Sequence, residues 1–248
     1  MKAIYVLWLR QIKKYSRSKA RIIGSLGQPI LFLVAFGFGL GPIFAKAGGG
    51  NYINFLAPGI IAMGIMFSAM FAGIDVIWDR QFGFLKETLV APVSRTSIVI
   101  GRTLGGATIA LFQGLVVFII SLFIGFKPVS FIHLPLILLV MILIAILFTA
   151  LGTAIAVRMR DMQAFPLIMN FLMMPLFFLS GSLFPTDGLP SGLAIVIKYN
   201  PLSYAMDGLR GLFSGVYHFS FALDLTVLIV VTVIVLAIAT ALFNKIEA

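Results

Sequence analysis

The side chains that could carry catalysis or hold a metal are few and lie far apart in this sequence. His133 and His218 are the only histidines, and neither has a carboxylate or a second histidine at metal-binding spacing. Asp75 lies near the end of an apolar run, where a buried carboxylate could relay protons, but Asp79 and Arg80 follow it closely. This pattern favours residues at a membrane surface and predicts neither a catalytic residue nor a metal site.

Nucleotide and thiol chemistry are also missing from the sequence. No G-x-x-x-x-G-K-[ST] motif occurs, so the chain has no phosphate-binding P-loop of its own. There are no cysteines, which excludes disulfides, thiolate metal sites and cysteine nucleophiles. Any ATP chemistry must therefore come from another polypeptide.

The composition is that of a membrane protein. Of 248 residues, 61% are hydrophobic and 10% are charged, whereas a soluble domain has about 25% charged residues. A soluble domain of this size could not bury so large an apolar fraction. The formal net charge of +10 could suggest nucleic acid, but the basic residues bracket apolar runs and form no single basic face. Membrane topology accounts for them, and no nucleic-acid partner is expected.

Six apolar runs approach the roughly 20 residues that a helix needs to cross a bilayer. They are about Ile22–Phe44, Ile53–Ile77, Thr103–Gly125, Leu134–Val157, Ala164–Phe184 and Ala222–Phe243. Fourteen of the 18 Lys and Arg residues fall on the side that holds both termini, and four fall on the other side. The positive-inside rule therefore predicts cytoplasmic termini in a multi-pass protein of the cytoplasmic membrane.

The basic segment 1–21 precedes the first span and is expected to be retained, because no cleavage site follows it. Ile4, Trp8, Ile12 and Tyr15 recur at helical spacing, with the cations largely on the other face. This pattern predicts a helix lying in the membrane interface. An unstructured basic tail is the alternative.

Two segments between spans have features of their own. On the cytoplasmic side, "FLKETLVAP" can form a short amphipathic helix that Pro92 stops. On the outside, segment 185–221 is apolar but broken by prolines, which predicts a pair of short re-entrant helices. No internal repeat is visible, so 1–248 is predicted to be one domain, with spans in 22–184 and 222–243. Gly101 and Gly105 form a G-x-x-x-G pattern that allows close helix approach.

Two longer stretches carry a family resemblance. "DRQFGFLKETLVAPVSRTSIVIGR" resembles the first intracellular loop of type-2 ABC transporter permeases, including its helix-starting Gly-(Lys/Arg). "PLFFLSGSLFPTDGLPSGLAIVIKYNPLSYAMDGLRGLF" resembles the family's second hallmark. The likeness covers nearly the whole chain and is strongest to the drug-resistance and nodulation-factor export branch. Phe84 and Gly192 depart from the residues common in the family, threonine and tryptophan, which puts local contacts there in doubt.

The resemblance implies an all-α integral membrane half-transporter. Two six-span permeases, expected to be a homodimer, would work with two copies of a separate ABC ATPase subunit. ATP and Mg²⁺ would be bound by that partner, with no cofactor in this chain. The family's coupling helix contacts the ATPase, and the interfacial helix 1–21 resembles the family's connecting helix. The coupling role falls on Arg80, Phe82, Gly83, Glu87, Pro92 and Arg95. Alternatively, the charged residues among these only set the topology.

The second and fifth spans line the central path in this family's fold. Met-rich surfaces adapt to varied apolar ligands. The substrate-path candidates are Met66, Phe67, Met70, Asn170, Met173, Met174 and Phe177. Packing against lipid or a neighbouring helix is the alternative for all of them except Asn170, whose amide should face protein or a cavity.

The segment before the last span is the candidate outer gate. Asn200 and Pro201 are suited to start a helix, and Asp207 and Arg210 could pair at i,i+3. The candidate gate residues are Phe184, Pro185, Pro190, Asn200, Pro201, Tyr204, Asp207 and Arg210. A purely structural cap over the outer leaflet is the alternative.

The sequence thus predicts the permease subunit of an ATP-driven exporter for a hydrophobic or amphipathic substrate, such as a drug, antibiotic, lipid or lipo-oligosaccharide. One alternative is an integral membrane enzyme or assembly factor acting on lipid-linked substrates, which would need a convergent polar site. Another is an ion-coupled secondary transporter, which would need inverted repeats and midplane carboxylates. Asp75 and Asp224 instead lie near span ends. An ATPase encoded beside this chain would separate the three.

Overall fold

A computed structural model describes residues 2–46, 50–184 and 190–245. These residues form helices and no strands, as the all-α prediction requires. The helices are α1 Lys2–Ser16, α2 Lys19–Lys46, α3 Tyr52–Phe71, α4 Ile74–Gln81, α5 Phe84–Val90, α6 Arg95–Ile124, α7 Leu134–Arg158, α8 Ala164–Phe178, α9 Ser191–Tyr199, α10 Pro201–Ser214 and α11 Phe221–Asn244.

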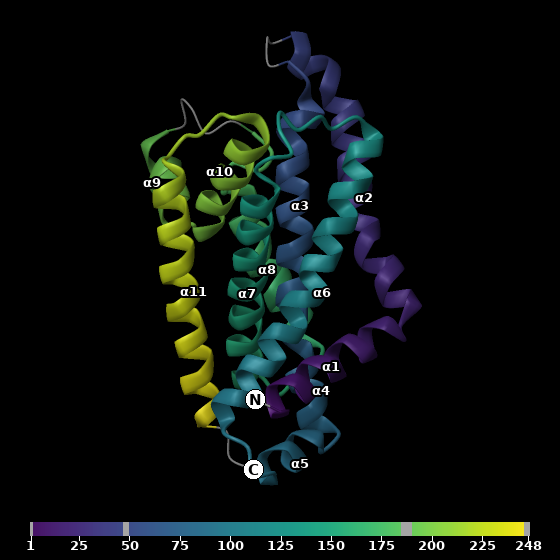
Figure 1. The fold of residues 1–248 in the computed structure, drawn as a ribbon, viewed down its shortest axis with the longest axis vertical. Helices are drawn as coiled ribbons and strands as arrows, with labels where there is room; N and C mark the ends of the chain where they lie inside the picture. The colour runs from purple at the N-terminus through teal and green to yellow at the C-terminus, as the bar shows by residue number, and fades with distance from the viewer. Residues whose placement is uncertain (1, 47–49, 185–189, 246–248) are drawn as a thin grey trace.

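The long helices run along the long axis of the molecule, α8 lies in the body of the bundle, and the other short helices lie at its two ends (Figure 1). At the lower end in Figure 1, α1 crosses the bundle and α5 lies below it, whereas α9 and α10 pack together at the upper end. The beginning of α1 and the end of α11 both lie at the lower end. There the Arg95 Nη1 donates a hydrogen bond of 2.6 Å to the Asn244 carbonyl oxygen.

Among the described residues, five helical segments are long and apolar enough to cross a membrane. They are Lys19–Lys46, Tyr52–Gln81, Arg95–Ile124, Leu134–Arg158 and Phe221–Asn244. The predicted fifth span, Ala164–Phe184, is a helix only as far as Phe178. Its 15 residues extend about 22 Å, whereas the hydrocarbon core is about 30 Å thick. Beyond it the chain turns at Gly181, which has a φ of 75°. The count of six spans stays a prediction.

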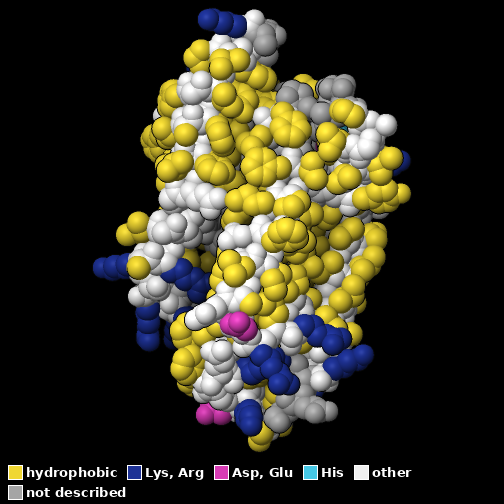
Figure 2. All heavy atoms as spheres, turned by 180° about the vertical axis from the view of Figure 1, so that it is seen from behind, with side chains coloured by type: hydrophobic (Ala, Val, Ile, Leu, Met, Phe, Trp, Pro, Cys, Tyr) yellow, Lys and Arg dark blue, Asp and Glu magenta, His cyan; other side chains and the backbone are white. Residues whose placement is uncertain are grey.

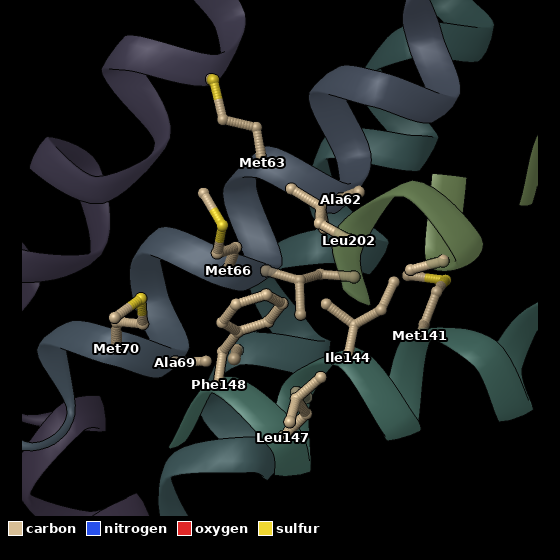
Figure 3. Close-up of a cluster of buried hydrophobic side chains, with 14 of the residues drawn as sticks. Ala62, Met63, Met66, Ala69, Met70, Met141, Ile144, Leu147, Phe148 and Leu202 are labelled. Atoms are coloured by element: carbon tan, nitrogen blue, oxygen red, sulfur yellow. The ribbon is translucent and has the colours of Figure 1, made fainter. Parts of the chain in front are cut away.

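Helix α3 is the centre of the bundle. In the most apolar part of the segment Tyr52–Gln81, which contains α3, 72% of the residues are buried, whereas the share is 17% in α2 and in α11, so those two helices form the periphery. Figure 3 shows Met66 and Met70 of α3 beside Phe148 of α7, with Leu202 of α10 in the same cluster. The core therefore joins the bundle to a short helix of the upper end.

Glycines allow a close crossing where α7 meets the break between α3 and α4. A Cβ atom on Gly73 would lie 2.4 Å from the Gly152 carbonyl oxygen. A Cβ on Gly152 would lie 2.3 Å from the Met70 carbonyl oxygen. Both backbones can approach this closely only because neither glycine has a side chain.

Local signals explain most helix boundaries. The Ser94 hydroxyl accepts a hydrogen bond from the Ser97 N–H, so α6 begins at Arg95, before the predicted span start at Thr103. Helix α5 ends before Pro92, as predicted. The predicted interfacial segment 1–21 divides between two helices, because a turn at 17–18 separates α1 from α2.

Candidate functional site

A cluster of ion pairs fastens α1 to α4 at the lower end of the bundle. Asp79 accepts a hydrogen bond of 2.8 Å from the Arg10 Nη2, and it also binds the Arg102 guanidinium. Asp75 accepts a bond of 2.6 Å from the Lys14 Nζ. Both carboxylates are only 4% exposed. Asp75 is therefore a buried ion-pair partner of Lys14, and its place at the membrane interface stays a prediction.

Arg102 is the most deeply buried cation of this cluster, with 4% of its surface exposed. Its Nη2 bonds to Asp79, while its Nε and Nη1 have no hydrogen-bond partner among the described residues. The Arg102–Asp79 pair joins α6 to α4, so three helices converge on one carboxylate. A buried charge that loses its partner destabilises a protein by several kcal/mol.

Sequence reasoning missed this cluster, although a spacing signal was available. Arg10 and Lys14 stand at i,i+4 on one helix, and Asp79 and Asp75 stand at i,i+4 on another. Residues at this spacing share one helix face, so the two cations and the two carboxylates can meet as a set.

The G-x-x-x-G pattern of α6 is occupied by α1 of the same chain. A Cβ on Gly101 would lie 3.0 Å from the Ile4 carbonyl oxygen, and a Cβ on Gly105 would lie 2.6 Å from the Gln11 Cβ. One turn further along, the indole of Trp8 donates a hydrogen bond of 3.0 Å to the Thr108 hydroxyl. The two glycines therefore pack against α1 and are not available to contact a second copy of the chain.

The candidate coupling residues divide into anchors and surface groups. Arg80 donates hydrogen bonds of 3.0 Å to the carbonyl oxygens of Val157 and Met159 at the end of α7. Arg95 is tied to the end of α11, as described above. Phe82 is 62% exposed, and Glu87 and Pro92 are also exposed.

Helix α5 protrudes from the bundle but is anchored to it near its start. Gly83 precedes it with a φ of 80°, a left-handed conformation that favours glycine. Leu85 is 2% exposed and packs into the core. The Arg10 guanidinium lies over the Phe84 ring at 5.5 Å, so the residue that binds Asp79 also contacts α5. Arg10 of α1 therefore links α5 to α4.

The candidate path residues lie in two environments. Met66, Met70, Met173 and Phe177 are fully or almost fully buried within the chain, and Figure 3 shows Met66 and Met70 among core side chains. The others reach the surface: Phe67 and Met174 are half-buried, and Asn170 is exposed. The role of all seven as a path stays a prediction.

The candidate outer-gate residues gather where α8, α9 and α10 meet, except Pro185, which lies outside the described residues. The Asn200 side chain caps α10 by accepting from the Leu202 N–H, and its Nδ2 donates to the Leu176 and Leu179 carbonyl oxygens at 2.7 and 3.1 Å. Pro201 is the first residue of α10, as expected for a helix start. Asn200 therefore ties the end of α8 to the start of α10.

The other candidate gate residues lie around this junction. Pro190 precedes α9, Phe184 is 37% exposed, and the Tyr204 hydroxyl donates a bond of 2.8 Å to the Lys198 carbonyl oxygen. Tyr204 also stacks on Phe219 with the ring centroids 5.2 Å apart. These contacts link α9, α10 and the segment before α11.

Asp207 and Arg210 do not form the expected ion pair but have separate partners. Asp207 accepts hydrogen bonds of 2.7 Å from the His218 and Phe219 N–H groups, which fastens the segment before α11. Arg210 donates to the Gly181 carbonyl oxygen at 2.8 Å and lies 4.0 Å from the centroid of the Phe55 ring. Burial lowers the pKa of Arg210 to about 10, so it stays charged at neutral pH.

The surface separates into an apolar body and a basic end. In Figure 2, hydrophobic side chains cover most of the long body, whereas most Lys and Arg side chains gather toward the lower end. That end carries α1, α4 and α5 (Figure 1). Among the described residues, no group of three or more His, Asp or Glu side chains could hold a metal ion.

The helical architecture, the apolar body and the basic end define a multi-pass membrane protein. The sequence model described as ABC-2 type transporter matches residues 2–214. The chain belongs to the ABC-2 type transporter family.

Individual similar proteins agree with this membership. The chain is 32% identical to the putative transport permease ycf38 of Porphyra purpurea, over 80% of this chain and 69% of that protein. It is 27% identical to nodulation protein J of Rhizobium leguminosarum bv. viciae, over 96% and 93% of the two chains. It is 26% identical to the inner membrane transport permease YadH of Escherichia coli K12, over 98% and 95%. The chain is therefore a membrane transport subunit.

Proposed function

We propose that this protein is the permease subunit of an ATP-driven exporter in the cytoplasmic membrane, where it acts as a homodimer with two copies of a separate ABC ATPase. The observation that carries the proposal is the protruding helix α5. Glu87 of α5 and Phe82, in the turn before α5, are exposed at the surface, while Arg80 at the end of α4 and Leu85 near the start of α5 anchor this segment to the bundle. A short exposed helix on a rigid base suits docking into a groove of a soluble partner.

The proposed orientation places α1, α5 and both termini in the cytoplasm. Most Lys and Arg side chains gather at this end of the molecule (Figure 2), and cytoplasmic loops carry an excess of such residues. Helix α1 then lies in the cytoplasmic interface, and α9 and α10 lie at the outer surface as re-entrant helices. Helix α8 completes six spans by continuing through the turn around Gly181.

In this proposal ATP and Mg²⁺ are bound by the ATPase. Closure of the two ATPase subunits would push α5, and the Arg10 contacts to Phe84 and Asp79 would carry the motion into the bundle. The substrate would be hydrophobic or amphipathic and would move between two permeases. Among the path candidates, Phe67, Asn170 and Met174 would contact it; their position at the surface of the chain supports this part of the proposal. Helices α9 and α10 would form the outer gate.

Reconstitution with an ATPase encoded beside this chain tests the proposal. Proteoliposomes would be assayed for ATP-dependent movement of a hydrophobic fluorescent dye and for ATP hydrolysis stimulated by the permease. Phe82→Ala and Glu87→Ala should lower both activities at least about tenfold with the permease still inserted, since each removes an exposed docking group. Lys46→Ala, an exposed change at the upper end of α2, is the matched control and should have no effect.

Two outcomes would contradict the proposal. Full transport by a double Phe82→Ala and Glu87→Ala variant would remove the docking role from α5. Dye transport driven by a proton gradient in liposomes that contain no ATPase would instead indicate an ion-coupled transporter.

A further inference from the structure

A cavity of about 400 Å³ lies where α1 turns into α2, against α3, α4 and α6. In Figure 1 this turn lies at the edge of the bundle, where α2 rises from the end of α1. The volume lies within the range of sites that bind small molecules. The lining residues used below are Arg21, Ser25, Phe67, Phe71 and Gln113.

The charged wall of the cavity has one positive charge in excess. The Arg21 Nη1 lies 3.9 Å from Asp75, but that carboxylate already holds the Lys14 Nζ at 2.6 Å. Two cations therefore share one carboxylate. The Arg21 side chain is 33% exposed, so an entering group can reach it. The unmatched charge favours an anion at this wall.

Gln113 of α6 supplies an unused acceptor. Its side chain is 2% exposed and lines the cavity, and its Nε2 donates a bond of 2.5 Å to the Ser25 carbonyl oxygen. The Gln113 Oε1 has no hydrogen-bond partner among the described residues. A buried acceptor without a donor is costly and uncommon in folded proteins. A ligand with a hydroxyl group would supply the missing donor.

The rest of the wall is aromatic and adjoins the apolar body of the protein. Phe67 and Phe71 of α3 line the cavity and are half-buried. Such a surface accepts an apolar chain and does not favour a free, fully hydrated ion. The cavity therefore combines an anion-attracting group, a hydrogen-bond acceptor and an apolar wall, which are the complements of one kind of molecule.

We infer that this cavity binds an anionic, hydroxyl-bearing amphiphile, with the anionic group at Arg21, a hydroxyl at Gln113 and the chain along Phe67 and Phe71. Phosphatidylglycerol has this chemistry. The inference needs only that the chain lies in a membrane and does not depend on an ATPase, a dimer or a direction of transport.

Native mass spectrometry of the purified full-length chain tests the site. The delipidated protein is titrated with dioleoylphosphatidylglycerol and, separately, with dioleoylphosphatidylcholine, which lacks both the hydroxyl groups and the net negative charge. Phosphatidylglycerol should bind about tenfold more tightly, as expected for one hydrogen bond to a charged or buried group. Arg21→Ala and Gln113→Leu should each lower this preference, because each removes one of the two groups that distinguish the lipids.

A neighbouring cation provides the matched control. Lys19→Ala, an exposed change two residues from Arg21, should keep the preference because Lys19 does not line the cavity. If Gln113→Leu lowers the unfolding temperature, the lipid preference of Arg21→Ala alone tests the inference. Arg21 is partly exposed, so its replacement should disturb the fold less. Equal binding of the two lipids, or an unchanged preference in Arg21→Ala, would overturn the inference. Displacement of the lipid by millimolar glycerol phosphate would show that the headgroup binds without an acyl chain. It would overturn the proposed contact of the chain with Phe67 and Phe71.

Discussion

Replacing Asp79 with alanine should lower the stability of the folded protein by an amount that depends on how deeply its two cationic partners are buried. Asp79 holds Arg10, whose side chain is 38% exposed, and Arg102, whose side chain is 3% exposed. An exposed pair contributes about 0–1 kcal/mol. A buried pair broken on one side costs about 3–5 kcal/mol, because the remaining charge has no counterion. Asp79→Ala should therefore cost several times more than Arg10→Ala.

Thermal unfolding of the purified protein in detergent measures the difference. For a chain of this length, 1 kcal/mol corresponds to about 2–4 °C, so Asp79→Ala should lower the unfolding temperature by about 6–20 °C. Arg10→Ala should lower it by at most about 4 °C. All variants should be scanned at one fixed heating rate, because the apparent unfolding temperature depends on that rate whenever unfolding is irreversible.

The double variant Asp79→Leu with Arg102→Met separates a buried charge from a general packing defect. It removes both charges and replaces them with apolar groups, so it should recover most of the lost unfolding temperature. Two results would refute the reasoning: an Arg10→Ala loss as large as that of Asp79→Ala, or a double variant no more stable than Asp79→Ala alone.

Three further predictions concern single sites. Gly105→Val should displace α1, because the new side chain would clash with Gln11, and trypsin should then cleave α1 faster. Gly39→Val is the control: Gly39 has open space around it, so the rate of cleavage should stay the same. Asn200→Ala should cost about 2–4 kcal/mol, because it removes a helix cap and two donated bonds; an unfolding temperature within about 2 °C of wild type would contradict this. Asp224→Asn should raise the unfolding temperature by about 2–4 °C. In the part of the chain that the structure describes, both carboxylate oxygens of Asp224 are buried without a hydrogen-bond partner, and the neutral amide removes the buried charge. A lower unfolding temperature would contradict this.

The ion-pair cluster also bears on how the proposed exporter would be coupled. Asp79 joins α1, α4 and α6, and Arg10 adds a contact to Phe84 of α5. A force applied to α5 therefore reaches three helices through side chains already in contact. If α5 is the docking helix, weakening the cluster by Arg10→Gln should lower ATP-stimulated transport even when the amount of folded permease in the membrane is unchanged. A loss of transport that only follows a loss of folded permease would assign the cluster a purely structural role.

Composition and local signals were enough to predict the helical membrane architecture. Long apolar runs form helices in lipid because every backbone polar group must be paired within the segment. Pro92 ends α5 and Asn200 with Pro201 starts α10, because these residues act on their own backbone. The length of α8 was less predictable. Its apolar run continues to Phe184, and only the folded chain shows a turn at Gly181.

The tertiary structure alone decided which residues meet. Asp75 and Asp79 bind cations 61 and 69 positions earlier in the chain, and the sequence offers many other cations as partners. Gly101 and Gly105 indicate a close helix contact, but only the packed bundle shows that α1 fills it. Hydropathy also fails to separate the buried Met66 from surface groups, because lipid is as apolar as the protein core. The sequence by itself therefore determined that helices form in a membrane, while packing decided their partners, because pairing depends on shape and charge between segments distant in the chain.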